Sequence, residues 1–232
     1  MNSCAQCAVR ESAICHSLSD GELSGLNSAG RHQKLQRGQT VVWQGDESLL
    51  VGNVIDGVLK LCVTTSEGKD QTLGIMFPSD FIGRPFGPKT QHSVVALTDA
   101  HICTFRRSAF DDFARQHPEL EHSLLKRTLV DLDRTRDWMV LLGRKSARAR
   151  VASFLMAMSE RASQDDQAPH TGMVRFDLPL SRQDIADLLG LTIETVSRQI
   201  THLREQGIIE TPNRRSVVVR DADGLLDCAQ EA

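Results

Sequence analysis

Residues 181–210 read SRQDIADLLGLTIETVSRQITHLREQGIIE and carry the most specific structural pattern in the chain. Ser181 and Thr192 are residue types that favour helix N-termini, and Gly190 lies between the two segments that they begin. Apolar residues that we expect to face inward follow each cap at helical spacing: Ile185, Ala186, Leu188 and Leu189, then Ile193, Val196, Ile200 and Leu203. Two short helices joined through a glycine predict a helix-turn-helix.

The second of these helices carries polar residues where a recognition helix meets base edges in the major groove. We expect the following side chains to be exposed near its N-terminal end: Glu194, Thr195, Ser197, Arg198 and Gln199. Arginine can bind guanine O6 and N7, and glutamate can accept from cytosine N4. Residues 207–221 predict a β-hairpin wing with Arg214 and Arg215 at its tip, placed for phosphates. Double-stranded DNA is therefore the predicted partner, and a helical pair used only for packing is the alternative.

The chain as a whole has the composition of a folded protein, with 40% apolar and 25% charged residues among 232. It has no apolar run of about 18 residues that could span a membrane. It also has no signal peptide, so we expect a cytoplasmic protein with no membrane partner. The formal net charge of -3 argues against indiscriminate coating of nucleic acid. Residues 144–220 nevertheless carry 12 Lys and Arg against 9 Asp and Glu, which puts the basic excess in the DNA-reading part.

Upstream of the helix-turn-helix, the texture of the sequence changes twice. Residues 18–30 predict a short amphipathic helix that ends at a glycine. Residues 33–106 contain short runs of Val, Ile and Thr between glycine turns, which predict an antiparallel β-roll. The fold class is therefore α+β. Its expected parts are a cysteine-bearing segment (1–17), a β-roll sensor domain (18–118), a long dimerisation helix (119–143) and a winged helix-turn-helix domain (144–232).

The long helix predicted over residues 119–143 carries a heptad pattern. Its members recur in alternating steps of three and four: Leu125, Thr128, Leu132, Thr135, Met139 and Leu142. Two identical helices pack along each other with this spacing, so we expect a homodimer with these six residues as its seam. Leu124, Val130, Trp138 and Leu141 lie off the seam and are expected to contact the helix's own domain. A helix buried only against its own domain is the alternative.

Three of the six cysteines lie close to the N-terminus, as Cys4, Cys7 and Cys15. Because reducing cytosol disfavours structural disulfides, such a group is more often metal-binding or redox-active. Iron–sulfur clusters prefer thiolate ligands, normally four per cluster, so a fourth would have to come from elsewhere in the chain. The remaining candidates are Cys62, Cys103 and Cys228. We expect Cys62 to be a buried small hydrophobic residue and Cys228 to be a thiol in an acidic, solvated C-terminal tail. Structural zinc, a dithiol switch and cysteines with no shared ligand are the alternatives.

The order of β-roll, long helix and winged helix-turn-helix, with the string LTIETVSRQITHLREQGIIE at residues 191–210, resembles the CRP/FNR superfamily of bacterial transcription regulators. In that family the second helix presents Glu, Ser and Arg to each half-site, which this chain matches at Glu194, Ser197 and Arg198. The resemblance implies a homodimer that reads an FNR-type palindrome close to TTGAT-N4-ATCAA.

A charged hairpin at residues 65–71, TSEGKDQ, resembles an activating region of the same family. It implies contact with RNA polymerase through four residues: Glu67, Gly68, Lys69 and Asp70. An ordinary solvated turn is the alternative interpretation.

The resemblance also selects the fourth cysteine. In FNR proteins, three N-terminal cysteines and one cysteine after the β-roll hold an oxygen-labile [4Fe-4S] cluster. The spacing of the three N-terminal cysteines in this chain resembles that of the FnrN/FnrL branch. The implied ligands here are Cys4, Cys7, Cys15 and Cys103. Oxygen, or nitric oxide, would then lower the population of the dimer that regulates anaerobic or microaerobic genes. Some members carry an aspartate in the seam that separates the apo-protein, whereas this chain has Thr135, so a weakened dimer is the alternative to dissociation in air.

Other sensing chemistries fit the sequence less well. Residues 81–97, FIGRPFGPKTQHSVVAL, stand where cyclic-nucleotide binders cradle the phosphate, but no glutamate follows the glycine, and Lys89 and Thr90 replace the usual Arg and Ser. Haem would need an axial ligand among scattered histidines. A regulator that responds to a small ligand, nitric oxide or thiol redox state without a cluster is the alternative function. We recognise no catalytic constellation and expect no enzyme activity.

Overall fold

The computed structural model describes residues 4–68, 70–165 and 173–231. The chain forms two compact units, Met1–Asp133 and Arg134–Ala232. The domain boundaries expected from the sequence flank the long helix on both sides, whereas the division between the compact units falls within that helix. In the described part of the chain, no helix is both long and apolar enough to cross a membrane.

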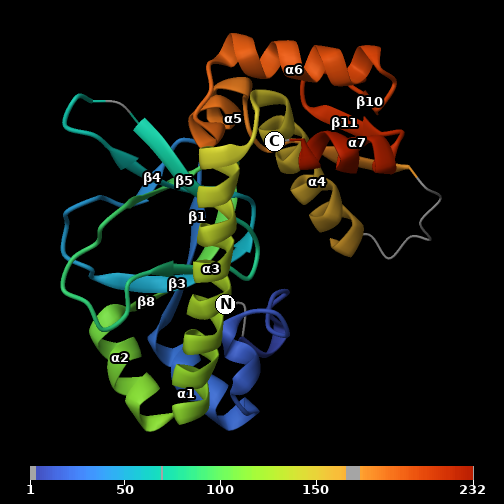
Figure 1. Cartoon of the computed structure of the whole chain (residues 1–232). Coiled ribbons are helices and arrows are strands. Elements are labelled where there is room, and N and C mark those ends of the chain that lie inside the picture. The colour runs from blue at the N-terminus through green and yellow to red at the C-terminus, as the bar shows by residue number, and fades with distance from the viewer. Residues whose placement is uncertain (1–3, 69, 166–172, 232) are drawn as a thin grey trace. The chain divides into compact units, whose positions relative to one another are not determined.

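Eight strands in the first unit build the β-roll (Figure 1). They are β1 (Gly30–Leu35), β2 (Thr40–Val42), β3 (Leu50–Asp56), β4 (Leu59–Thr64), β5 (Asp70–Met76), β6 (Phe81–Gly83), β7 (Ser93–Ala96) and β8 (Ala100–Arg106). They pair antiparallel in two four-stranded sheets, with the orders β1-β8-β3-β6 and β2-β7-β4-β5. Val54, Leu59 and Ile102 are fully buried in the core of the roll. The predicted antiparallel β-roll is confirmed, and it begins three residues earlier than expected.

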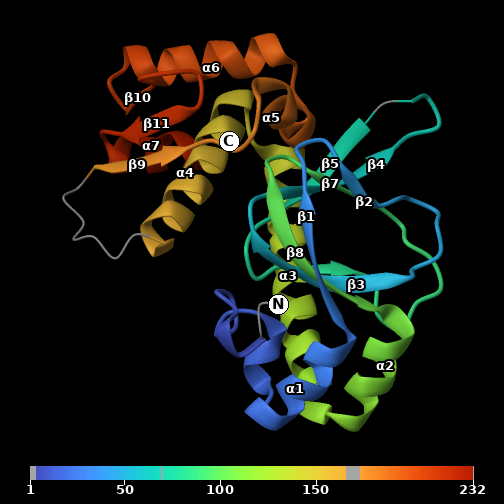
Figure 2. The same ribbon diagram turned by 180° about the vertical axis from the view of Figure 1, so that it is seen from behind.

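Helices gather at one end of this roll (Figures 1 and 2). They are α1 (Asp20–Ala29), α2 (Arg107–Gln116) and the first turns of α3 (Pro118–Arg144), preceded by two 3-10 turns, η1 (Cys4–Gln6) and η2 (Ile14–Ser17). Helix α1 begins where Ser19 and Glu22 cap each other's backbone, and it ends before Gly30 as predicted. One apolar core joins these helices to the sheet and contains Phe105, Phe110 and Leu120. Cys4 and Cys103 belong to the same core, which therefore connects the cysteine segment to α3.

Helix α3 exposes the predicted seam within the single chain. Five of its six residues are exposed and the last is half-buried, in the order Leu125, Thr128, Leu132, Thr135, Met139 and Leu142. Leu124 and Leu141, both off the seam, are buried as expected, and Trp138 is half-buried. The expectation for Val130 is wrong, because this side chain is 47% exposed. It lies six residues beyond Leu124, which turns it roughly 120° away from the buried face.

The second unit contains the predicted winged helix-turn-helix. Its elements are α4 (Ala147–Asp165), β9 (Val174–Asp177), α5 (Arg182–Leu189), α6 (Ile193–Glu205), β10 (Ile209–Glu210), β11 (Ser216–Val219) and α7 (Ala222–Gln230). Ser181 and Thr192 cap α5 and α6 through their side chains. Gly190 takes φ 62° between them, the left-handed conformation that a tight turn requires. The wing forms as a three-stranded sheet in the order β10-β11-β9.

Two expectations for this unit need correction. Ile193 is 37% exposed, because the buried stripe of α6 begins one turn later at Val196. The C-terminal segment is not a loose acidic tail but the helix α7, which packs on α4. Cys228, expected to be a tail thiol, is only 3% exposed. The Asp221 side chain caps this helix, and its apolar residues recur at helical spacing on the buried face.

Candidate metal centre and nucleic-acid interface

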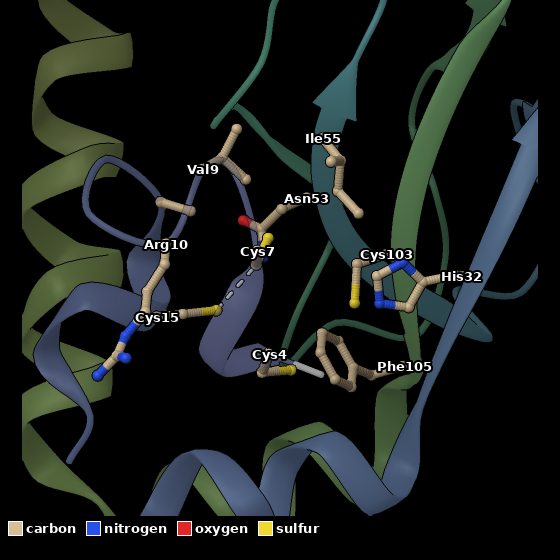
Figure 3. Close-up of a pocket in the computed structure, with 11 residues that line it drawn as sticks. Cys4, Cys7, Val9, Arg10, Cys15, His32, Asn53, Ile55, Cys103 and Phe105 are labelled. Atoms are coloured by element: carbon tan, nitrogen blue, oxygen red, sulfur yellow. Dashed lines mark hydrogen bonds between the residues drawn. The ribbon is translucent and has the colours of Figure 1, made fainter. Parts of the chain in front are cut away.

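Four cysteine side chains surround one small cavity in the first unit (Figure 3). They are Cys4, Cys7, Cys15 and Cys103, the four that the resemblance implied. Three come from the N-terminal segment and the fourth from β8, so the cavity lies between that segment and the sheet (Figure 3). Cys62, by contrast, lies on β4 in the other sheet, where it is buried as a small apolar side chain.

The sheet register places Cys103 at this cavity. In β8 its cross-strand neighbours are His32 on β1 and Asn53 on β3, and both of these residues also line the cavity. Gly52 lets the strands approach at this point, because a Cβ there would collide with the carbonyl oxygen of Cys103. The Asn53 side-chain amide lies 3.8 Å from the Cys15 sulfur, and Asn27 Oδ1 accepts from the Cys4 thiol at 3.2 Å. Polar side chains of the scaffold therefore hold two of the four thiols.

The thiols influence one another's ionisation. Burial raises the pKa of Cys15 to about 12, and the nearby Cys4 and Cys7 add to this shift. Burial likewise raises the pKa of Cys103 to about 12, with further contributions from the three N-terminal cysteines. The pKa of Cys4 is raised by burial and then by Cys7. These thiols are accordingly protonated at neutral pH in the metal-free protein, and a metal that bound them as thiolates would displace protons.

The rest of the lining is apolar and cationic. Val9, Ala13, Ile55 and Phe105 line the cavity beside the thiols. Arg10 contributes its stem, while its guanidinium points away from the cysteines (Figure 3) and donates to Asp20 at 2.6 Å. The enclosed space is about 20 Å³, enough for about one water molecule. No three Cys, His, Asp or Glu side chains of the described residues converge closely enough to hold a single metal ion.

The predicted DNA-reading side chains lie on α6 as expected. Glu194, Ser197 and Arg198 are exposed, while Thr195 and Gln199 are half-buried. Hydrogen bonds from the backbone of Glu194 and from the Thr192 side chain hold the pKa of the Glu194 carboxyl below its ordinary value. This carboxylate is therefore ionised at neutral pH and available as an acceptor.

A groove beside α6 contains basic residues that the sequence analysis did not select. Arg182, from the start of α5, and Arg204, from the last turn of α6, line it together with Arg214 of the wing. Burial lowers the pKa of Arg182, and its buried Nη1 has no hydrogen-bond partner among the described residues. Three guanidinium groups around one groove suit a phosphate oxygen. Arg215, the other predicted wing residue, is exposed.

The charged hairpin lies where β4 turns into β5. Glu67, Gly68 and Asp70 are exposed there, and Lys69 lies outside the described residues. Residues 81–97, which stand where cyclic-nucleotide binders cradle the phosphate, make contacts within the roll itself. Thr90 is buried there and donates to the backbone oxygens of Trp43 at 2.5 Å and Asp46 at 3.2 Å. Its hydroxyl therefore ties two loops of the roll together.

A β-roll followed by a long helix and a winged helix-turn-helix defines a DNA-binding transcription regulator. Two family models match the chain, the cyclic nucleotide-binding domain over residues 32–117 and the Crp-like helix-turn-helix domain over residues 149–228. The transcriptional activator protein FnrL of Cereibacter sphaeroides is 39% identical over 98% of this chain and 92% of its own length. A probable transcriptional activator of Rhizobium leguminosarum bv. viciae is 43% identical over 96% of this chain and 91% of its own length.

Solved structures give the same result. The structure of FixK2 from Bradyrhizobium japonicum is 30% identical and superimposes with a TM-score of 0.78, covering 88% of this chain and 98% of that one. The chain belongs to the CRP/FNR family and is a transcription regulator of the FNR/FixK type. It binds DNA through the helix-turn-helix of its second unit.

Proposed function

We propose that this protein is an oxygen-responsive transcription activator and repressor that works as a cytoplasmic homodimer with a [4Fe-4S] cluster. The observation that carries the proposal is the single cavity lined by Cys4, Cys7, Cys15 and Cys103. These thiols come from segments about a hundred residues apart in the chain, and four is the number of thiolates that such a cluster takes. Two relatives whose names call them transcription activators support the activating role.

The residues at the cavity fit this group in chemistry. Soft thiolates are the preferred ligands of iron–sulfur clusters, and the apolar wall of Val9, Ile55 and Phe105 limits access of water. A bound cluster would supply an iron centre that oxygen can oxidise.

The packing of the first unit supports a link between this site and dimerisation. Cys4 and Cys103 share their apolar core with Leu120 and Leu124 of α3. Displacing the N-terminal segment would therefore alter the support of the helix that carries the seam. In the proposed mechanism ligation of the segment favours the dimer that is competent for DNA, and loss of the ligation lowers that population.

The seam supports the homodimer. Within a single chain, Leu125 is 56% exposed, Leu132 42% and Met139 68%, and all three lie on one face of α3. A second copy would cover this apolar stripe and bring two recognition helices to the half-sites of a palindrome close to TTGAT-N4-ATCAA. Contact with RNA polymerase through the exposed hairpin at Glu67, Gly68 and Asp70 completes the proposal.

A pair of single substitutions tests the ligand set. Cys103→Ser and Cys62→Ser each replace a buried cysteine in a strand, with 7% and 5% exposure, but only the first faces the cavity. We expect anaerobically purified Cys62→Ser to keep its iron and brown colour and Cys103→Ser to lose both, as measured by iron and sulfide analysis and absorbance. A Cys103→Ser protein with undiminished iron would show that the fourth ligand is another residue.

A further inference from the structure

A turn between β5 and β6 touches both the cysteine segment and α3. This turn, residues 77–80, contains Ser79, whose φ of 79° lies in the left-handed region that non-glycine residues rarely adopt. Such backbone strain persists only where the surroundings enforce it, and it is often found at switch regions. The contacts around this turn show what enforces it here.

On one side the turn is attached to the wall of the cysteine cavity. The Ser79 hydroxyl lies 2.5 Å from the hydroxyl of Ser12, which lies between Cys7 and Cys15 in the chain. The turn also pairs with β3 at Val54. The Ser79 N–H donates to the backbone oxygen of Val54 at 2.9 Å, and the Val54 N–H donates to the backbone oxygen of Asp80 at 3.0 Å. The neighbours of Val54 in β3, Asn53 and Ile55, both line the cavity. A displacement of the cysteine segment would therefore alter the contacts of this turn.

On the other side the turn is attached to the dimerisation helix. Asp80 is 9% exposed and forms an ion pair with Arg127 of α3. The second carboxylate oxygen of Asp80 accepts from the Phe77 N–H at 2.9 Å, which fixes the carboxylate on the turn. Because Asp80 is buried, moving Arg127 away from it would leave this carboxylate poorly compensated.

Arg127 lies between the buried and the exposed faces of α3. Leu124, three residues before it, is buried in the core, while Leu125 and Thr128 belong to the exposed seam. The guanidinium also lies 3.7 Å from Asp131, one turn further along the helix. A shift of Asp80 would thus act on α3 beside Leu125, the first residue of the seam.

We propose that Ser12, Ser79, Asp80 and Arg127 form a coupling chain that transmits the state of the cysteine cavity to the seam of α3, with Arg127 as a positioning residue. This inference rests on the proposed function, because it requires that the cysteine segment exist in two states. It adds a defined route, through one strained turn and one partly buried ion pair, by which these states bias the dimer. Neither the cysteines nor the DNA-reading residues form part of this route.

The test compares two neighbouring substitutions that each remove one positive charge from α3, Arg127→Gln and Lys126→Gln. Lys126 is exposed and lies off the seam. For each full-length protein, iron content is measured first, and then the dissociation constant for the palindrome before and after exposure to air. The ratio of the two constants is the oxygen response, and allosteric couplings usually give ratios of about 5 to 150.

We expect Arg127→Gln to load iron as wild type does but to show an oxygen response within about twofold of one, whereas Lys126→Gln keeps the wild-type ratio. Arg127→Lys, which retains the charge opposite Asp80, should restore most of the response. An iron-loaded Arg127→Gln protein with the response of Lys126→Gln overturns the coupling chain and leaves the proposed function standing. A wild-type protein without iron overturns the proposed function and the coupling chain with it.

If Arg127→Gln does not load iron, Ser12→Ala decides the matter. The contact between the Ser12 and Ser79 side chains is exposed, so its removal spares the core. We expect Ser12→Ala to retain its iron and to lower the oxygen response by at least about twofold. An unchanged response in this variant overturns the coupling chain.

Discussion

Cys103 shows how a residue gains its role from the sheet that contains it. The sequence supplied three N-terminal thiols and three further candidates, of which Cys62 and Cys103 both lie in apolar strands. Only the pairing of β8 with β1 and β3 brings Cys103 beside His32 and Asn53 at the cavity, while Cys62 belongs to the other sheet. Spacing alone could not separate them, because the choice depends on which sheet each strand joins. The family resemblance made the choice that local chemistry left open.

The raised pKa values at this site predict slow alkylation in the metal-free protein. Only the thiolate reacts with iodoacetamide, and a pKa of about 12 for Cys15 and Cys103 leaves little thiolate at pH 8. We expect both to react at least about a hundredfold more slowly in the folded protein than in urea, because a pKa of about 12 in place of the ordinary 9.0 leaves far less thiolate at this pH. The rate should rise as pH approaches 12, since the raised pKa delays ionisation. Equal rates for folded and unfolded protein in a mass-spectrometric time course would contradict the burial of these thiols.

At the scale of elements, the sequence predicted best where local signals coincide. Capping side chains, a glycine turn and apolar residues at helical spacing mark α5 and α6, and these signals agreed with the fold except at the exposed Ile193. Helix α7 was not predicted, because its acidic residues suggested a solvated tail, although Leu225, Cys228 and Ala229 lie on one buried face. The expected burial of Val130 was wrong, because a heptad pattern shows which residues share a stripe but not how far the neighbouring domain extends around the helix.

The exposed stripe of α3 predicts that a charge in it weakens the dimer. Leu132→Asp would place two like charges opposite each other at the centre of the seam, and buried charges without partners cost several kcal/mol. We expect the dimer dissociation constant to rise at least about a hundredfold, measured by sedimentation of the anaerobic protein. Leu73→Asp is the matched control, because Leu73 is a similarly exposed leucine (39% against 42%) on β5. Equal dimer strength in the two variants would show that this face of α3 is not the interface.

The end of α3 is fastened to the helix-turn-helix by Arg150 of α4. Its guanidinium donates to the backbone oxygens of Leu142 at 2.7 Å, Lys145 at 3.0 Å and Leu189 at 3.0 Å. These are carbonyls at the C-terminal ends of α3 and α5 and in the turn before α4, where helical carbonyls lack partners. Arg150 thereby orients the DNA-reading helices on the helix that carries the seam.

The substitution Arg150→Met should consequently lower the affinity for a palindrome more than the affinity for a single half-site. The variant keeps the aliphatic stem but leaves three carbonyls without a charged donor, which we expect to lower the free energy of unfolding by about 2–4 kcal/mol. Because two recognition helices must match a fixed half-site spacing, affinity for the palindrome should fall more than affinity for a single half-site. Titration of both DNAs by fluorescence anisotropy checks this. A parallel loss on both would contradict an orienting role.

For the molecule as a whole, the proposed cluster site and the DNA-reading helix belong to different compact units. The four thiols lie in Met1–Asp133 and the recognition helix in Arg134–Ala232, and α3 is the element that passes through the division between them. One continuous helix of 27 residues is a suitable carrier, since it can transmit a change at its first turns along its length. The sequence predicted this order of parts, but not the turn at residues 77–80 that contacts the helix beside the apolar core.

The most direct test of the proposed function is the DNA affinity of the anaerobically purified protein, measured with its absorbance before and after exposure to air. We expect a brown protein with about four irons and four sulfides per chain. Its affinity for the palindrome should fall at least about fivefold as the colour bleaches. A colourless protein that binds the palindrome equally well with and without oxygen would contradict the proposed function.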